Sequence, residues 1–150
     1  MSRTIGYRAI LVPVADNAET DIALDIACRL AAERHCSLTA IAVVVVPATL
    51  PIDAHMPEEE AHVKHLLRRA ETAGDSYGIH VARRLVRARD AATAIVEQAA
   101  SDRAELVVIG VPRSRRRPYG RTTESVLKGA PCRVMLIAAP AETRPARIAV

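Results

Sequence analysis

Short runs of branched apolar residues alternate along this chain with longer segments in which apolar residues recur every three or four positions. The short runs are rich in Val and Ile and have the length of buried strands, whereas the spacing in the longer segments is that of amphipathic helices. The predicted strands cover residues 8–14, 37–46, 79–87, 105–110 and 132–138, and the predicted helices begin near residues 16, 57, 91 and 122. This alternation predicts an α/β fold.

Residues that favour a helix N-terminus stand where the helical segments begin. Polar residues at 16–20 can start the first helix, and Pro57 has the fixed φ that suits a first helical position. Asp90 can cap the third helix, and Thr122 or Thr123 can cap the last one.

Helical crossovers between successive strands imply a right-handed, three-layer arrangement with helices on both faces of a parallel sheet. We expect an open, Rossmann-like sheet of five mainly parallel strands in the order 3-2-1-4-5, with the partly polar strand 79–87 at an edge. Ligands of such sheets bind beyond the carboxyl ends of the strands, where the strand order reverses. The loops at 13–17 and 111–119 therefore fall on one candidate site.

Composition agrees with this architecture. The chain of 150 residues is long enough for one domain with its own core, and it contains no Phe or Trp and only three Tyr. The core is therefore expected to consist of Val, Ile, Leu and Ala. We expect the domain to span residues 1–138, and residues 139–150, which are rich in Ala, Pro and Arg, to form a flexible tail.

The cysteines and the hydropathy indicate where in the cell the protein is expected. Cys28, Cys36 and Cys132 show no CxxC spacing, which is typical of buried, reduced thiols in a cytoplasmic protein. No apolar run approaches the roughly 20 residues that cross a bilayer, so no membrane insertion is expected.

The segment from the fourth strand to the last helix carries the most distinctive chemistry. A strand that ends in Gly110 leads through Arg113, Arg115, Arg116 and Arg117 to Gly120, at the mouth of a helix. Unpaired backbone N–H groups and the positive end of the helix dipole favour an anion at such a helix start, and the arginines add charge. The pattern predicts an anion site, with a solvated basic loop as the alternative.

The charge distribution argues against a nucleic-acid surface. The net charge is only +4, and much of the basic excess lies in two clusters, Arg83 to Arg89 and Arg113 to Arg121. No aromatic residues are interleaved for base stacking. Local binding of an anion is therefore favoured over nucleic-acid binding.

Two segments resemble the universal stress protein family. They are residues 9–14, with the sequence AILVPV, and residues 120–137, which include the sequences ESVL and APCRV. The resemblance extends from about Tyr7 to Ala138 and implies a five-stranded fold of the adenine nucleotide alpha hydrolase-like type. It also implies a cytoplasmic homodimer and, in one branch of the family, ATP binding.

The ATP-binding branch carries Gly-x-x-Gly, nine residues, and then Gly-Ser or Gly-Thr after its fourth strand. Here Gly110 stands at the first glycine, Arg113 takes the place of the second, and the interval to Gly120 is three residues shorter. Arg121 occupies the hydroxyl position, and Thr122 follows one residue later. A glycine lets a phosphate approach the backbone closely. An arginine at the same position can instead bind the phosphate through its side chain, often bidentately.

At the other end of the predicted site, the family's acidic residue corresponds to Ala15, with Asp16 displaced by one position. Val43 matches the family's base-contacting valine. The resemblance thus implies that the base and ribose contact Pro13, Ala15, Asp16 and Val43. The predicted phosphate-binding residues are Gly110, Arg113, Arg115, Gly120, Arg121 and Thr122.

The predicted function is a dimeric regulatory module that binds or senses an adenine nucleotide, ATP or AMP, or a cyclic dinucleotide, with Mg²⁺ only alongside ATP. The dimer would form through the fifth strand, Arg133 to Ile137, at a sheet edge. One alternative is a dimerisation or stress-response module without a nucleotide. Another is a regulatory partner of a membrane transporter, because Gly-Arg-Thr before the last helix is similar to domains of this fold on permeases.

No enzymatic arrangement is visible from the spacing of the reactive residues. Among the five histidines, His62 and His65 lie three residues apart beside Glu58 and Glu59, which favours a solvated helix face over a metal site. Slow nucleotide hydrolysis would need a magnesium ligand, and Asp16 is the acidic residue best placed for it. We therefore expect neither a catalytic residue nor a protein-bound metal.

Overall fold

The computed structural model describes residues 8–112 and 120–138, and within them five parallel strands form one sheet in the order β3-β2-β1-β4-β5. The predicted strand order is confirmed, with β3 and β5 at the edges. The strands are β1 (Ala9–Pro13), β2 (Ser37–Val45), β3 (Val81–Ala88), β4 (Leu106–Val111) and β5 (Arg133–Ala138), and the helices are α1 (Ala18–Arg34), α2 (Pro57–Asp75), α3 (Ala91–Ser101) and α4 (Arg121–Gly129).

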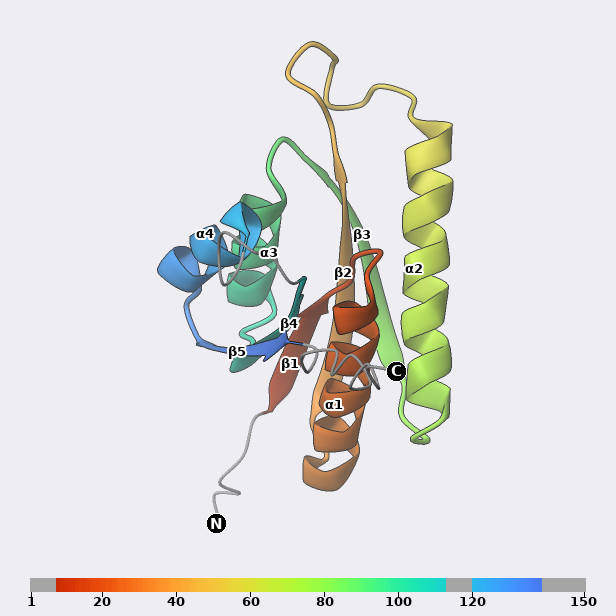
Figure 1. The fold of residues 1–150 in the computed structure, drawn as a ribbon, viewed down its shortest axis with the longest axis vertical. Helices are drawn as coiled ribbons and strands as arrows, with labels where there is room; N and C mark the ends of the chain where they lie inside the picture. The colour runs from red at the N-terminus through yellow and green to blue at the C-terminus, as the bar shows by residue number, and fades with distance from the viewer. Residues whose placement is uncertain (1–7, 113–119, 139–150) are drawn as a thin grey trace, which may run out of the picture.

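Two helices cover each face of the sheet (Figure 1). Helices α1 and α2 pack on one face around side chains such as Ile10 and Val12, and α3 and α4 pack on the other around Leu11 and Ile41. Because successive strand residues point to opposite faces, neighbouring residues of β1 enter different cores. As predicted, Val, Ile, Leu and Ala provide nearly all of the buried side chains in the described part.

The helix starts follow the predicted chemistry with one exception. Asn17 caps α1 by accepting a hydrogen bond from the backbone N–H of Thr20, and Pro57 begins α2. Asp90 caps α3, as predicted. The prediction of a threonine cap for α4 is wrong, because Gly120 is the N-cap and the helix begins one residue later.

The cysteines are less uniformly buried than the sequence predicted. Cys28 is buried in α1, whereas Cys36 and Cys132 are half-buried just before β2 and β5, and none of the three forms a disulfide bond within the described residues. Burial is the main cause that raises the pKa of each thiol, to about 11 for Cys28.

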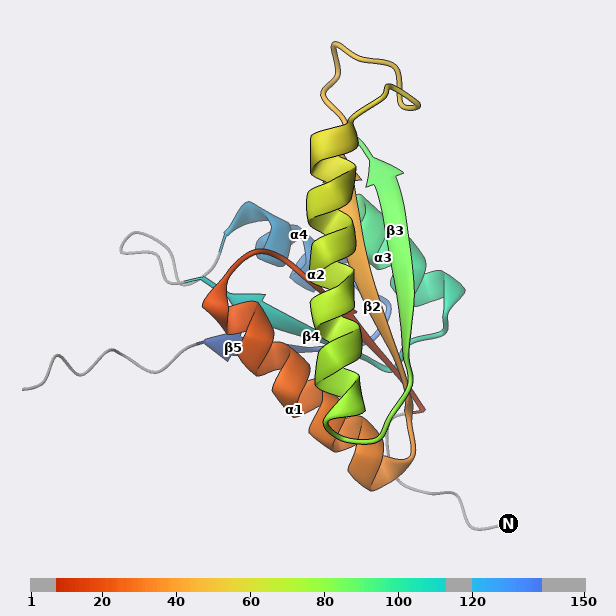
Figure 2. The ribbon, with the colours of Figure 1, turned by 90° about the vertical axis from the view of Figure 1, so that its right-hand side faces the viewer.

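The first arginine cluster, Arg83 to Arg89, has structural contacts that its sequence did not reveal. Arg83 pairs with Glu71 of α2 at 2.9 Å, and Arg87 pairs with Glu60 at the start of the same helix. Arg89 donates to backbone carbonyl groups of the loop between β2 and α2, which projects beyond the sheet in Figure 2. Arg83, Arg87 and Arg89 thus fix α2 and the loop to β3, and of the cluster only the exposed Arg84 forms no hydrogen bond or ion pair with either segment within the described residues.

Two further predictions lie outside the described residues, namely the tail at 139–150 and the arginines between Pro112 and Gly120. In the part of the chain that the structure describes, no helix combines the length and apolar character needed to cross a membrane.

Candidate functional site

A pocket of about 590 Å³ opens at the carboxyl ends of β1, β2 and β4, where the strand order reverses. Its size and position are those of a small-molecule site in an open α/β sheet. Helix α2 closes one side, and α3 and α4 close the other. The lining residues include Pro13 to Asn17, Thr20, Ile41, Val43, His62, Val63, Leu66, Ala91, Ile95, Ile109, Gly110, Pro112 and Gly120 to Thr123.

Hydrogen bonds fix the loop after β1. The backbone N–H of Ala15 donates to the hydroxyl of buried Thr20 at 3.3 Å, and the N–H of Asn17 donates to the carbonyl of Ala15 at 3.0 Å. The backbone of Val14 continues the sheet by donating to Ile41 at 2.8 Å. The loop is therefore held from both sides, which leaves the side chain of Asp16 at the pocket.

Asp16 faces His62, which comes from α2. The distance from Asp16 Oδ2 to His62 Nε2 is 3.6 Å, and both side chains are more than half exposed. This contact joins the loop after β1 to α2, two segments that are distant in sequence. His62 therefore lies beside Asp16 at this end of the pocket. Its position in the sequence did not indicate this placement.

The first turn of α4 forms the opposite, cationic end. Gly120 has no side chain to cap this helix, so the first-turn N–H groups lack a capping partner at the N-cap position. Arg121 and Thr122 are exposed and line the pocket, while Thr123 is buried in its wall. Among the described residues, Arg121 forms no ion pair. Such a helix start attracts an anionic group.

The walls between these two ends are apolar. Ile41 and Val43 of β2, Leu66 of α2 and Ile95 of α3 contribute aliphatic side chains to the lining. A flat heterocyclic ring can lie against such walls, with a polar group at each end to orient the ligand.

The structure brings eight of the ten predicted binding residues to this one pocket: Pro13, Ala15, Asp16, Val43, Gly110, Gly120, Arg121 and Thr122. Arg113 and Arg115 lie outside the described residues. Whether these residues bind a ligand stays a prediction. Sequence reasoning missed Thr20 and Thr123, whose polar side chains in otherwise apolar helix faces were the available signal.

A second pocket, of about 560 Å³, lies between α1 and α2, and paired polar groups form part of its lining. Arg69 lies 2.5 Å from Asp21, and the hydroxyl of Tyr77 donates to Asp25. In the described parts of the chain, no three His, Cys, Asp or Glu side chains come together in a way that could hold a metal ion.

The family model described as the universal stress protein family matches residues 6–138. A universal stress protein family structure from Burkholderia pseudomallei is 27% identical, with a TM-score of 0.70, over 89% of this chain and 97% of that chain. The universal stress protein UspA of Lactobacillus plantarum is 25% identical, with a TM-score of 0.74, over 89% and 99%. The Archaeoglobus fulgidus protein solved in complex with dAMP is 21% identical, with a TM-score of 0.69, over 87% and 98%. Curated protein sequences gave no match.

Proposed function

Because the chain belongs to the universal stress protein family, we propose that it is a regulatory module that binds an adenine nucleotide in the pocket at the ends of β1, β2 and β4. The observation that carries the proposal is the layout of this pocket. It has a carboxylate at one end, an uncapped helix start beside an arginine at the other, and aliphatic walls between them.

Each part of a nucleotide has a chemically suitable counterpart. The base would lie against Val43 and Ile95, and the ribose hydroxyls would donate to Asp16. The phosphates would accept hydrogen bonds from the N–H groups at the start of α4 and from Arg121. The sequence adds Arg113 and Arg115 to the phosphate end as predicted side-chain ligands.

Similar folds support this ligand class. Three structures with TM-scores of 0.65 to 0.69 were solved with cAMP, dAMP or AMP. AMP, ATP and a cyclic dinucleotide are therefore the ligands to test here, with Mg²⁺ expected only alongside ATP. We propose a binding function without catalysis, and among the described residues Asp16 is the single carboxylate that lines the pocket.

We further propose that the protein acts as a cytoplasmic homodimer through β5. This strand pairs with β4 along one side, and its residues from Val134 to Ile137 are only half-buried. An edge strand with partly exposed apolar residues is suited to contact a second copy. Light scattering coupled to size-exclusion chromatography should give a dimer mass, and a monomer at micromolar concentration would overturn this part.

Calorimetric titration tests nucleotide binding. Saturable binding of AMP or ATP with a stoichiometry near one per chain supports the proposal. Absence of heat for AMP, ATP and cyclic di-AMP at millimolar concentration overturns it and favours the alternative of a ligand-free dimerisation module.

A further inference from the structure

Three of the four large apolar side chains that are exposed in the described residues lie at one end of the molecule. Val45, at the end of β2, is 49% exposed, and Leu50 and Ile52, in the loop that follows, are 41% and 45% exposed. We call these three residues the apolar tip. The loop projects beyond the sheet (Figure 2), and none of the three residues belongs to either core. Exposed apolar side chains gathered in this way mark an interaction surface.

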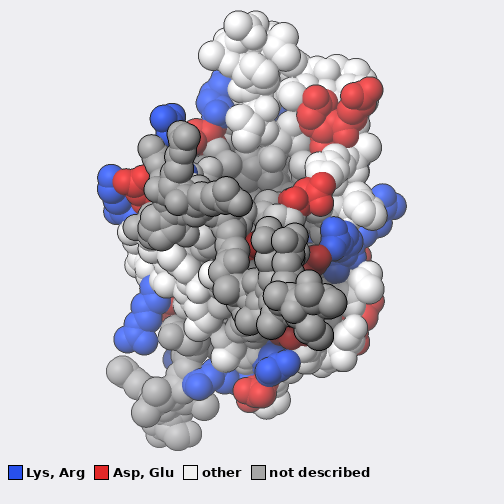
Figure 3. Space-filling model, viewed as in Figure 1, with Lys and Arg blue, Asp and Glu red and all other residues white. Residues whose placement is uncertain are grey.

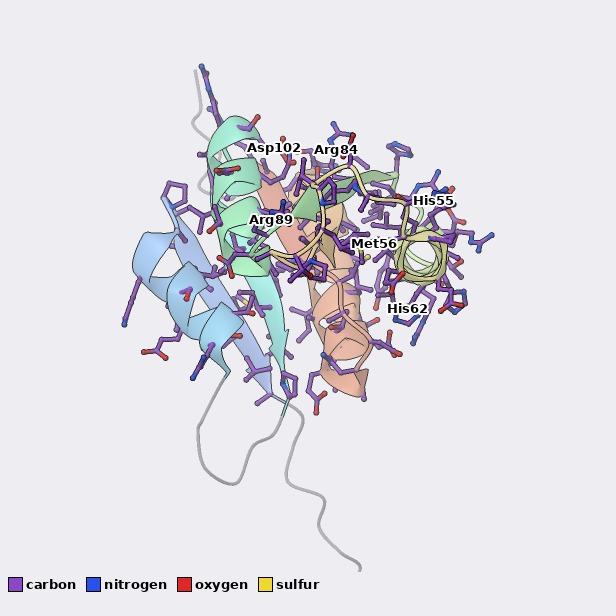
Figure 4. All side chains as sticks on the ribbon, turned by 90° about the horizontal axis from the view of Figure 1, so that it is seen from above. His55, Met56, His62, Arg84, Arg89 and Asp102 are labelled. Carbon is purple, nitrogen blue, oxygen red and sulfur yellow. The ribbon has the colours of Figure 1, made fainter. Side chains whose placement is uncertain are left out.

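The loop that carries the tip is held by two arginines from the end of β3. Arg89 Nη1 donates to the carbonyl of Leu50 at 2.6 Å and also to the carbonyl of Pro47. Arg87 Nε donates to the carbonyl of Ile52 at 3.0 Å, and the same side chain bonds the carbonyl of Ala54. Figure 4 looks onto this end of the molecule and labels Arg89 there.

The arginine contacts have an energetic consequence for binding. A loop that is already ordered loses little conformational entropy when a partner binds to it. Met56, labelled beside the loop in Figure 4, is buried and anchors its far end to the core. The apolar tip is thus presented in a fixed arrangement.

A groove of about 460 Å³ lies at the foot of the tip, between the end of β2 and the start of α2. Val43, Val44, Val45 and Val63 give it an apolar lining, and Glu58 and Glu59 add two exposed carboxylates. Within the described residues neither carboxylate forms an ion pair. We call this feature the acidic groove.

The acidic side chains gather near the start of α2, beside the uncharged tip, in Figure 3. Glu58 and Glu59 make the groove side of this end negative, although the chain as a whole carries a net charge of +4 and the exposed Arg89 lies against the loop. Anionic lipids and nucleic acids would be repelled by Glu58 and Glu59. A two-fold contact centred on the groove would set these carboxylates against their own counterparts, which is also unfavourable.

We propose that the apolar tip and the acidic groove together dock a segment of a partner protein that carries aliphatic side chains flanked by Lys or Arg. The aliphatic groups bury the tip and the valines of the groove, and the cations pair with Glu58 and Glu59. The groove shares Val43, His62 and Val63 with the nucleotide pocket, whereas the tip residues and both carboxylates lie outside that pocket.

Selection of short random peptides displayed on phage, against the full chain, tests this proposal. The selected peptides should combine aliphatic residues with Lys or Arg. The affinity of the best peptide should fall by at least about tenfold for the double variant Leu50→Ser/Ile52→Ser, and by less for Glu58→Gln/Glu59→Gln. The Leu127→Ser variant should bind like the wild type, because Leu127, the fourth exposed apolar residue, lies on α4.

Controls keep these outcomes decisive. Thermal unfolding should show that the variants are folded, and a copy of the best peptide with each Lys or Arg replaced by Glu should not bind. Four results would overturn the proposal: failure to select any peptide, peptides without basic residues, affinities unaffected by the tip variant, or loss of a dimer in Leu50→Ser/Ile52→Ser. The last result would assign the tip to contact between copies.

Discussion

Gly110 packs directly against the backbone of Glu19, where β4 passes the first turn of α1. A Cβ atom at position 110 would lie 2.4 Å from the carbonyl carbon of Glu19 and 2.5 Å from the amide nitrogen of Thr20. Real Cβ contacts are longer than this, so helix and strand approach closely only because residue 110 is glycine. The glycine is therefore required by packing, and it also brings the loop of Asp16 close to β4.

The two glycines of the pocket should respond differently to substitution. Gly110→Ala should lower the free energy of unfolding by about 1 to 3 kcal/mol, because the start of α1 must move. At Gly120, φ is −80° and an added Cβ meets nothing within 4 Å. Gly120→Ala should therefore cost less than about 1 kcal/mol, through poorer capping. Urea unfolding compares the two, and equal losses would contradict the packing role.

Asp16 is expected to recognise the ribose. Asp16→Asn should weaken AMP binding about tenfold or more, because a charged acceptor is replaced by a neutral amide. Asp53→Asn is the matched control, since Asp53 is exposed in the β2–α2 loop and does not line the pocket. Calorimetry on the folded variants measures both. If the two variants bind AMP equally well, the ribose does not contact Asp16.

Arginine side chains are expected to hold the phosphates. Arg113→Ala, Arg115→Ala and Arg121→Gln should each weaken ATP binding by about 1 to 3 kcal/mol for each lost charged hydrogen bond. Arg84→Ala should leave the affinity unchanged, because Arg84 is exposed on β3 and does not line the pocket. If ATP affinity is unchanged in one of these three variants, that arginine does not bind the phosphates.

Asp90 links the stability of α3 to pH. Its carboxylate accepts hydrogen bonds from the hydroxyl of Thr93 at 2.7 Å and from the Thr93 N–H at 3.0 Å, and these bonds lower the pKa of Asp90. A carboxyl group whose pKa is lower in the folded state stabilises the fold at neutral pH. That contribution is lost as the pH falls through the folded-state pKa.

The matching test is Asp90→Asn, which keeps a capping oxygen but cannot titrate. Between about pH 5 and pH 2, its free energy of unfolding should fall less steeply than that of the wild type. Asp53→Asn, which removes an exposed carboxylate that forms no ion pair within the described residues, should follow the wild-type curve. Superimposable pH curves for Asp90→Asn and the wild type would refute the link.

The fold was largely predictable because its signals are local. Val- and Ile-rich strands, helix periodicity and caps such as Asp90 lie within a few residues of the structure they specify. The strand order 3-2-1-4-5 was an assumption, because the handedness of helical crossovers alone does not fix it, and the structure confirms it. The threonine cap of α4 failed because Gly120 also suits an N-cap, and the sequence pattern did not discriminate between them.

The site was predictable only in part because some of its contacts are long-range. His62 reaches Asp16 only through the packing of α2 beside the β1 loop. In the same way, the sequence shows Arg87 and Arg89 as a basic cluster, and only the tertiary fold brings them to the carbonyls of the loop near Leu50. No local pattern encodes such contacts.

The most direct test of the central claim is calorimetric titration of the purified full chain with AMP and ATP, with and without Mg²⁺, after mass spectrometry of anything released on acid denaturation. The account predicts a released nucleotide, or saturable binding near one per chain, that weakens in Asp16→Asn and Arg121→Gln but not in Asp53→Asn. No released nucleotide and no heat at millimolar concentration would contradict it, as would binding that is indifferent to both pocket variants.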